Sequence, residues 1–354
     1  PGQSQRFKSR STRIFNHNRL VFDLNYFASH PMSFAYITLI TGELYLPGVL
    51  NLGKVLKSYD PDHKLAVLAD STALSHELLN LISQTFDDVI DIKDSVIVGD
   101  SLKVHELLGR SELAVTFSKI LLWSLTNYAK LVYLDADTLP IQSLAHLFKD
   151  YSPAQREVIA SPDAGWPDIF NSGVLILQPL ELVFQELTEF VASTESFDGA
   201  DQGILNEFFT GVPSSKSAQW KRLPFTYNVT PNTLYQYSPA LRRFSKDIKI
   251  VHFIGPVKPW HTGGSHISSG LDHHNLWWDH FNKHFPGELG AKILKRKGEA
   301  HNLQFEKTEN AWEKDDVKSV VLDSGSVEDS AIPAVFPWEQ KAILEPFRVF
   351  PGEK

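Results

Sequence analysis

The stretch of sequence that decides the fold is LVYLDADT, residues 131–138, an apolar run that ends abruptly in two carboxylates separated by one residue. Burying unpaired acids costs several kcal/mol, so Asp135 and Asp137 are expected at an open strand end that faces a cation. Such a pair can hold one divalent metal through hard oxygen ligands while the metal carries a diphosphate. Taken alone, such a pair is more often a loop with two solvated acids, so the interpretation as a metal site depends on the rest of the chain.

The composition predicts a globular protein with one large core. With 354 residues, of which 42% are hydrophobic, the chain supports one domain of roughly 250 residues plus appendages. A net charge of -8 argues against a nucleic-acid binder. The absence of cysteine excludes disulfides and thiolate chemistry and fits a reducing compartment. Since no apolar run approaches the ~20 residues of a membrane span, we expect a cytoplasmic protein without a membrane partner.

The two ends of the chain differ from its middle. Residues 1–31 are basic and rich in Ser and Asn, and the only methionine, Met32, directly precedes the first strong strand at 34–41. We therefore interpret 1–31 as a non-native or disordered extension and 32–285 as the folded domain. Residues 286–330 are charged and Ser-rich, which predicts a flexible linker. Residues 331–354 regain aromatic side chains and are interpreted as a short motif region, either a docking peptide or a strap on the domain.

The middle of the chain alternates between strand and helix patterns. The hydrophobic pattern predicts strands at 34–41, 64–69, 89–92 and 174–177 and helices at 46–59, 76–86, 179–193 and 202–209, with a further helical spacing over 117–128. Such alternation implies a Rossmann-like, mainly parallel sheet with flanking helices, whose ligands bind at the carboxyl ends of the strands. The acidic pair lies at such an end.

Two later segments carry polar groups of interest. In the loop 197–203, Gly199 and Gly203 are expected to let the backbone approach a ligand, and Asp201 is suited to cap the following helix. His252 ends another apolar strand, where a lone histidine is more often a satisfied core group than a ligand. Together with Asp135 and Asp137, however, it could complete an O,O,N site, which suits Mn²⁺ better than Ca²⁺ and leaves positions for phosphate oxygens.

Five segments resemble a known family. Residues 134–139, 163–173, 197–203, 223–228 and 251–260 are similar, in the same order, to motifs of the glycogenins, the self-glucosylating starters of glycogen synthesis in family 8 of the retaining glycosyltransferases. The resemblance runs from about 34 to 281, and residues 336–339 and 348–350 look like tail motifs of yeast-type members. It implies a GT-A fold, UDP-glucose as donor, and Mn²⁺ as cofactor with Mg²⁺ as the alternative.

The resemblance also assigns residues to the site. It implies that the metal ligands are Asp135, Asp137 and His252, with Ala136 between the acids, and that the diphosphate is clamped by Gly255 and Lys258. The uridine-binding set would be Leu39, Thr41, Gly42 and Tyr45, with Gly42 in place of the family's usual asparagine. Donor-binding cations would be Arg110 and Lys119, although without this context Lys119 is a solvated helix lysine. The glucose-facing set would be Asn171, Ser172, Asp198, Asp201 and Gln202.

The chemistry follows from charge. Cleavage of the glucose–phosphate bond leaves negative charge on UDP and oxocarbenium character on the sugar. The metal and Lys258 should stabilise the first, and Asp163, Asp198 and Asp201 are placed to orient the glucose and stabilise the second. Asp201 is the nucleophile candidate in a double displacement and an acceptor-orienting group in a same-face attack. The sequence leaves both open.

The acceptor is the remaining question. Tyr235, in the turn-rich segment 230–239, matches the family's self-glucosylated tyrosine. The resemblance then implies a homodimer that builds a short α-1,4-glucan primer for glycogen synthase. It also implies that glycogen synthase binds the C-terminal tail. Two alternatives are a retaining family 8 transferase with an external sugar acceptor and an inactive scaffold. The sequon at Asn228 is discounted because Pro231 follows it. The histidines of 272–284 could bind a metal adventitiously, but we interpret them as solvated helix positions.

Overall fold

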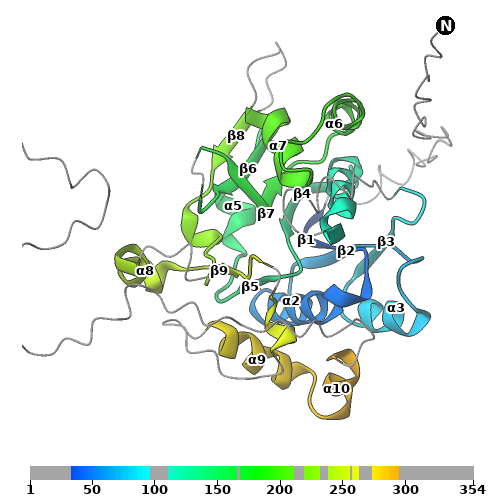
Figure 1. Ribbon diagram of the computed structural model, residues 1–354, viewed down its shortest axis with the longest axis vertical. Coiled ribbons are helices and arrows are strands. Elements are labelled where there is room, and N and C mark those ends of the chain that lie inside the picture. The colour runs from blue at the N-terminus through cyan, green and yellow to red at the C-terminus, as the bar shows by residue number, and fades with distance from the viewer. Residues whose placement is uncertain are drawn as a thin grey trace, which may run out of the picture. The chain divides into compact units, whose positions relative to one another are not determined.

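A mixed sheet forms the centre of the structure (Figure 1). The computed structural model describes residues 33–95, 111–165, 168–210, 219–231, 238–255, 257–262 and 273–294. Within them, the sheet has the strand order β3 (Asp88–Asp91), β2 (Lys64–Ala69), β1 (Ser33–Ile40), β4 (Tyr128–Leu134), β7 (Phe170–Leu177), β6 (Glu157–Pro162) and β8 (Gln219–Arg222). These described residues belong to one compact unit.

The strand directions bring several chain segments to one edge of the sheet. Strands β3, β2, β1 and β4 are parallel, and β7 runs antiparallel to both of its neighbours, β4 and β6. As a result, the carboxyl ends of β4 and β6 and the amino end of β7 meet at the same edge. The prediction of a mainly parallel sheet is confirmed, and the reversed β7 explains how Asn171 and Ser172 come to lie beside the end of β4.

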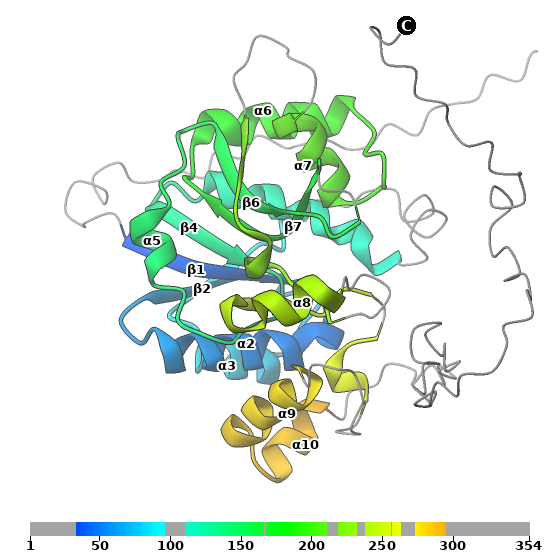
Figure 2. The same cartoon turned by 90° about the vertical axis from the view of Figure 1, so that its left-hand side faces the viewer.

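Helices cover both faces of the sheet (Figure 2). One face packs against α2 (Leu46–Tyr59), α3 (His76–Ser83), α9 (His273–His284) and α10 (Glu288–Leu294), and the other against the 3₁₀ segment η2 (Ser111–Ser124), α6 (Glu181–Ser193) and α7 (Asp201–Thr210). Alternate side chains of β1 serve the two cores: Tyr36 and Ile40 point into the first, Ile37 and Leu39 into the second. Because both faces are buried, the strands read as continuous apolar runs.

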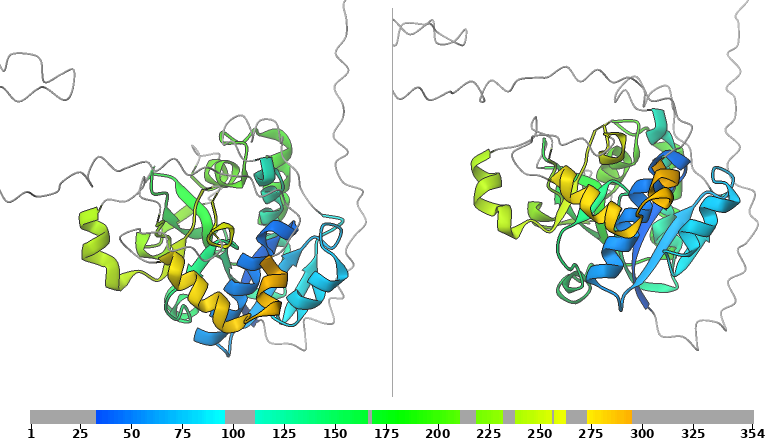
Figure 3. Two further views of the ribbon diagram at one scale, coloured as in Figure 1. Left: turned by 60° about the horizontal axis from the view of Figure 1, so that its bottom comes forward. Right: turned by 90° about the horizontal axis from the view of Figure 1, so that it is seen from below.

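Short elements complete the description. Strands β5 (Thr138–Pro140) and β9 (Ile250–His252) form a two-stranded antiparallel ribbon in which Thr138 lies opposite His252. Figure 3 shows α9 and α10, in yellow and orange, lying beside α2. The remaining elements are η1 (Glu43–Tyr45), α5 (His146–Asp150), η3 (Phe225–Tyr227), α8 (Ser238–Phe244), η5 (Ser245–Asp247) and η6 (Pro259–His261).

Several predicted element limits are confirmed and others are wrong. The helix 46–59 and the strand 64–69 have the predicted limits, but α3 ends at Ser83, where the chain turns and the Phe86 N–H donates to the Ile82 carbonyl (2.9 Å). The apolar spacing over 117–128 corresponds to a 3₁₀ segment that ends at Ser124, since periods of 3.0 and 3.6 residues are hard to tell apart over so short a stretch. Strand β7 starts at Phe170 instead of 174, because Asn, Ser and Gly disguise its first half.

The folded domain extends past its predicted end. Helix α10 lies in the segment predicted as linker, and its Ile293 is fully buried against the first core. The prediction of a linker is therefore wrong for 288–294. Residues 1–32 and 295–354 lie outside the described residues, and so do the predictions made for them. Among the described helices, none is long and apolar enough to cross a membrane.

Gly48 in the first turn of α2 packs against the Asp-x-Asp turn. A Cβ at this position would lie 2.4 Å from the Ala136 carbonyl oxygen and 2.7 Å from the Trp260 ring. Since neither neighbour can move freely, we expect Gly48→Ala to lower the free energy of unfolding by about 1–3 kcal/mol, despite the better helix propensity of alanine. Chemical denaturation measures this.

Gly42→Ala is the matched control. No atom lies within 4 Å of a Cβ at Gly42, and its backbone is extended at φ −176°, so alanine should not lower the stability. Equal stabilities of the two variants would contradict the close approach of α2 to the turn.

Candidate active site

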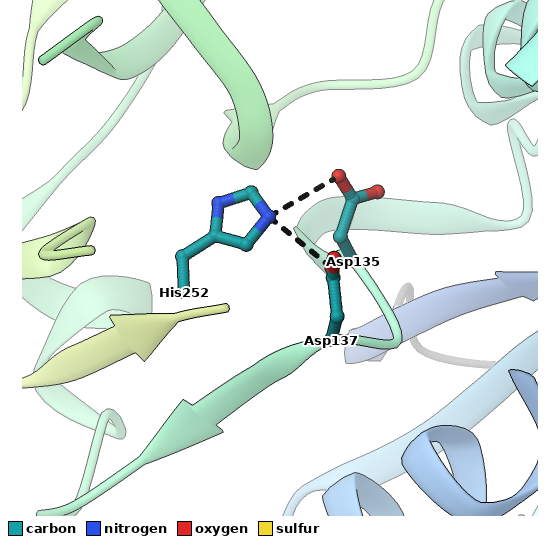
Figure 4. Close-up of side chains that lie close together, drawn as sticks. All are labelled: Asp135, Asp137 and His252. Carbon is teal, nitrogen blue, oxygen red and sulfur yellow. Dashed lines mark ion pairs between the residues drawn. The ribbon is translucent and has the colours of Figure 1, made fainter. Parts of the chain in front are cut away.

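Asp135, Asp137 and His252 converge at the end of the central sheet (Figure 4). His252 Nε2 lies 3.1 Å from Asp137 Oδ1 and 3.9 Å from Asp135 Oδ2. Within the part of the chain that the structure describes, this is the one group of three such side chains whose ligand atoms all lie within 4.8 Å of one another. The structure thus brings together the three predicted metal ligands.

Backbone pairing explains how the three residues meet. The Asp135 N–H donates to the Gly173 carbonyl (2.8 Å), and the Thr138 N–H and hydroxyl both donate to the Asp135 carbonyl (3.0 and 2.7 Å), so the acids sit in a tight turn between β4 and β5. The register of β5 with β9 then places His252 next to Asp137. Gly173 makes room for the imidazole, because a Cβ there would lie 2.3 Å from His252 Cε1.

Each carboxylate of the pair has one oxygen held by a neighbour. Asp135 Oδ1 accepts hydrogen bonds from the Tyr133 hydroxyl (2.5 Å) and from Lys119 Nζ at 3.1 Å. Asp137 Oδ2 accepts from Lys258 Nζ in a short ion pair. The other oxygens, Asp135 Oδ2 and Asp137 Oδ1, are the ones that face His252.

His252 likewise has one ring nitrogen held by a protein partner and the other facing the acids. His252 Nδ1 lies 2.8 Å from Asn228 Oδ1, so the Nδ1–H donates to the amide oxygen and Nε2 faces the two carboxylates. Two carboxylate oxygens and one imidazole nitrogen form a donor set that suits a divalent transition metal and leaves coordination positions for phosphate oxygens. The residues present therefore fit the predicted cofactor class.

Two buried lysines balance the charge of the site. Lys119 is 1% exposed and bridges Asp135 and Asp201, whose Oδ2 lies 2.6 Å from its Nζ. Burial by itself lowers the pKa of Lys119, but the two carboxylates raise it above its usual value. The interpretation of Lys119 as a solvated helix lysine is therefore wrong.

Asp137 is buried, whereas the sequence predicted an open strand end. It is 7% exposed, and Lys258, its ion-pair partner, is 2% exposed. Burial by itself raises the pKa of Asp137, but the charges of Lys258 and His252 outweigh that effect and hold the pKa well below its usual range. The burial is tolerated because the carboxylate is paired.

The residues predicted to face glucose form a hydrogen-bonded group. The Ser172 hydroxyl donates to Asp201 Oδ2 (2.7 Å), and Asn171 Nδ2 donates to Gln202 Oε1 (3.0 Å). Both amides, Asn171 Nδ2 and Gln202 Nε2, also donate to Asp163 Oδ2, at 3.2 and 3.1 Å. The amino end of β7 and the first turn of α7 thus present these side chains together.

Asp198 has a local structural role. Its Oδ1 accepts the N–H groups of Ala200 (2.8 Å) and Gly203 (3.1 Å) at the start of α7, together with the Ser196 hydroxyl (2.7 Å). The prediction that Asp201 caps this helix is therefore wrong, and Asp198 caps it. Gly203 serves the cap as well, since a Cβ there would lie 2.3 Å from Asp198 Oδ1. Burial raises the pKa of Asp198 in spite of these hydrogen bonds.

The predicted uridine and diphosphate segments lie around the same strand ends. Leu39 is buried at the end of β1, and Tyr45 packs edge-on against Trp260 with ring centroids 5.8 Å apart. Gly255 has φ +111°, a conformation that favours glycine. Lys258 Nζ lies 5.8 Å from the centre of the Tyr45 ring, so the two segments approach each other. Arg110 and Tyr235 lie outside the described residues.

Sequence reasoning missed two partners of the metal ligands. Tyr133 lies near the end of β4, two residues before Asp135, which directly follows the strand; side chains two residues apart in extended chain point the same way, a signal that could have found this contact. Asn228 appeared as the last residue of the motif 223–228 and in a sequon, and neither gave it a role in the metal site. It is buried and bonded to His252, so it is not presented for glycosylation. The interpretation of His280 and His284 as solvated is also wrong: both are partly buried, and burial lowers the pKa of each.

Asp137→Asn should destabilise the protein because it leaves Lys258 buried with a weakened partner. Removing one member of a buried ion pair costs about 3–5 kcal/mol, and we expect a loss in the free energy of unfolding of up to that size in metal-free buffer. Asp168→Asn is the control, because the Asp168 side chain is 98% exposed beside Arg222. If denaturation curves of the two variants coincided, the buried pair would not carry the stability assigned to it.

Comparison with known proteins gives a family match. The sequence profile described as Glycosyl transferase family 8 matches residues 37–264. Glycogenin-1 of Oryctolagus cuniculus is 40% identical over 261 residues, covering 70% of this chain and 75% of that protein. Glycogenin-2 of Saccharomyces cerevisiae is 37% identical over 270 residues, covering 69% of this chain and 70% of that protein.

Solved structures share the fold. The bifunctional glycosyltransferase WbbM superposes with a TM-score of 0.53 at 17% identity, covering 76% of this chain and 52% of that one. The galactosyltransferase LgtC, solved with donor and acceptor sugar analogues, gives 0.50 at 18% identity, covering 70% and 95%. These likenesses establish the architecture alone.

Proposed function

The chain belongs to glycosyl transferase family 8, and we propose that it transfers glucose from UDP-glucose to its own tyrosine and extends the product as a short α-1,4-glucan primer. Membership makes it a glycosyltransferase, and the likeness to glycogenins of animals and fungi confirms the resemblance found in the sequence. Two observations support the proposal: the sequence identity to glycogenins, and the convergence of Asp135, Asp137 and His252 beside the residues predicted to face glucose.

We assign the cation at this site as Mn²⁺, with Mg²⁺ as the alternative, since an imidazole ligand favours the softer ion. When bound, the cation supplies positive charge beside the diphosphate of the donor. Asp135 and Asp137 would hold it through Oδ2 and Oδ1, and His252 through Nε2. Family membership and the donor set support a divalent metal; the choice of Mn²⁺ is our proposal.

Lys258 and Gly255 are proposed to bind the diphosphate. Lys258 Nζ already lies at the metal-ligand carboxylate of Asp137 and also donates to the Phe253 carbonyl (2.9 Å), so it reaches the place where phosphate oxygens would enter. Its charge would stabilise the UDP oxygen that leaves with the bonding electrons. Arg110 is proposed as a second donor-binding cation.

The glucose would be oriented by the amides and carboxylates beside Lys119. Asp163 fixes the amide groups of Asn171 and Gln202, because its Oδ2 accepts a hydrogen bond from each. Asp201 Oδ2 is held in place by an ion pair with Lys119 and by a hydrogen bond from the Ser172 hydroxyl. In a double displacement, an Asp201 oxygen would attack C1 of glucose; in a same-face attack, Asp201 would orient the acceptor hydroxyl. Asp198 caps the start of α7 and thereby helps to fix the position of Asp201 and Gln202 in its first turn.

The uridine is proposed to bind at the end of β1, against Leu39, Thr41, Gly42 and Tyr45. Gly42 takes the place of the asparagine usual in the family, and a side chain built there would meet open space. Ala136 contributes backbone between the two acids. These positions lie at the carboxyl edge of the parallel strands, where ligands of such sheets bind.

The acceptor and partners are also part of the proposal. Tyr235 would be the glucosylated residue, and the protein would act as a cytoplasmic homodimer in which one subunit primes the other. Glycogen synthase would bind the C-terminal motif region, residues 331–354. The likeness to glycogenins supports these assignments.

The direct test of the function is intact-mass measurement after incubation of the chain with UDP-glucose and Mn²⁺ without an acceptor. The proposal predicts a ladder with steps of one hexose. The second candidate function, transfer to an external sugar, predicts an unchanged mass together with transfer to an added saccharide. An unchanged mass would therefore contradict self-glucosylation.

Tyr235→Phe should separate the acceptor from the catalytic machinery. The change removes one hydroxyl, so UDP-glucose hydrolysis or glucosylation of an added maltoside should persist while the chain itself gains no hexose. Radiolabel from UDP-glucose, followed by intact-mass analysis, measures both.

A mixture of two variants, neither of which should glucosylate itself, tests transfer between subunits. His252→Gln removes the imidazole ligand but keeps Tyr235, and Tyr235→Phe supplies an intact catalytic site. After the two are mixed, label should appear on the His252→Gln chain only. Hexose gain on Tyr235→Phe alone would contradict the acceptor assignment, and peptide mapping would then examine Tyr237 first.

A further inference from the structure

We propose that Asn228 is a positioning residue for metal binding, one that directs His252 Nε2 toward Asp135 and Asp137. The observation is the hydrogen bond between His252 Nδ1 and Asn228 Oδ1, at 2.8 Å, between two buried side chains. Asn228 contributes no ligand atom to the three-residue group. This inference rests on one part of the proposed function, the binding of a divalent cation by Asp135, Asp137 and His252.

The backbone holds Asn228 beside His252 without help from its side chain. The Asn228 N–H donates to the Phe225 carbonyl (2.9 Å) at the end of η3. The next residue, Val229, pairs with β9 through both of its backbone groups. Its N–H donates to the Ile250 carbonyl (3.1 Å), and its carbonyl accepts from the His252 N–H (2.8 Å). Because these bonds already fix the segment, the side-chain oxygen of Asn228 is available for a role in the site.

Packing alone cannot decide which edge of the His252 ring faces the carboxylates. An imidazole turned by half a revolution about its Cβ–Cγ bond fills nearly the same space, so the close contact with Gly173 fits both orientations. The turned ring would present Cε1 to the acids in place of Nε2. The hydrogen bond to Asn228 favours the observed orientation, and so does the contact of Nε2 with Asp137 Oδ1, since each needs a nitrogen at its edge of the ring.

The bond also sets the form of the ring that binds a metal. When Nδ1 carries the proton and donates it to Asn228, the lone pair of the neutral ring lies on Nε2, which faces Asp137 Oδ1 at 3.1 Å. Outer partners of this kind fix the orientation and basicity of a ligating histidine, and their loss costs about 10–100-fold in metal affinity.

The experiment compares the Mn²⁺ affinity of full-length variants in the presence of saturating UDP, with free Mn²⁺ measured by electron paramagnetic resonance. Asn228→Leu keeps the size of the side chain but removes the acceptor, and we expect about 10–100-fold weaker binding. Asn228→Asp keeps an oxygen acceptor and adds charge, so it should bind at wild-type affinity or more tightly. Asn228→Ser, whose hydroxyl is too short to reach the ring, replaces the leucine variant if that one does not fold.

Asn51→Leu is the matched control. Asn51 is also a fully buried asparagine, but its Nδ2 donates to the Trp277 carbonyl (3.2 Å), so its loss should lower the melting temperature and leave Mn²⁺ affinity unchanged. Wild-type affinity in Asn228→Leu or Asn228→Ser, or weak binding in Asn228→Asp, would overturn the inference. A wild-type protein that binds no Mn²⁺ with UDP would instead overturn the proposed metal site itself.

Discussion

The structure depends on the compensation of three carboxylates by two buried lysines at the edge of one sheet. Lys119 bridges Asp135 and Asp201, and Lys258 pairs with Asp137. The two lysines, Asp137 and Asp201 are buried and Asp135 is partly exposed. Because buried charges are tolerated only when paired, each lysine fixes the oxygen that it contacts. The oxygens left over, with His252 Nε2, face a common centre. A divalent cation there would compensate the remaining negative charge, and the donor diphosphate would complete its coordination.

The sheet topology makes this arrangement possible. A wholly parallel sheet would place the amino end of β7 at the far edge, but its antiparallel pairing brings Ser172 and Asn171 beside the acids. The β5–β9 ribbon supplies the histidine from a segment more than a hundred residues away in the sequence. Two glycines allow the approach: Gly173 accommodates the imidazole, and Gly48 lets α2 pack on the turn. The side chains proposed to bind metal, sugar and diphosphate thus come from different elements of the chain but lie at one edge of the sheet.

Much of this site could be predicted from the sequence because its parts are marked locally. The apolar runs that end in Asp135 and His252 predict two strand ends, and the family motifs predict that both residues belong to one site. The partners were not predictable in the same way. The burial of Lys119, the cap by Asp198 and the contact of Asn228 with His252 each depend on side chains brought together by tertiary packing. The helix at 288–294 was missed because its short sequence shows no sustained apolar period, although Ile293 is buried in the first core and Leu294 packs against it.

The central claim is that Asp135 Oδ2, Asp137 Oδ1 and His252 Nε2 share one cation while their other polar atoms are held by protein partners. Anomalous diffraction from crystals grown with Mn²⁺ and UDP tests it most directly. The account predicts a single strong peak at coordination distance from those three atoms, with Asp135 Oδ1 still bonded to Tyr133 and Lys119. A peak coordinated without His252, or through Asp135 Oδ1, would contradict it.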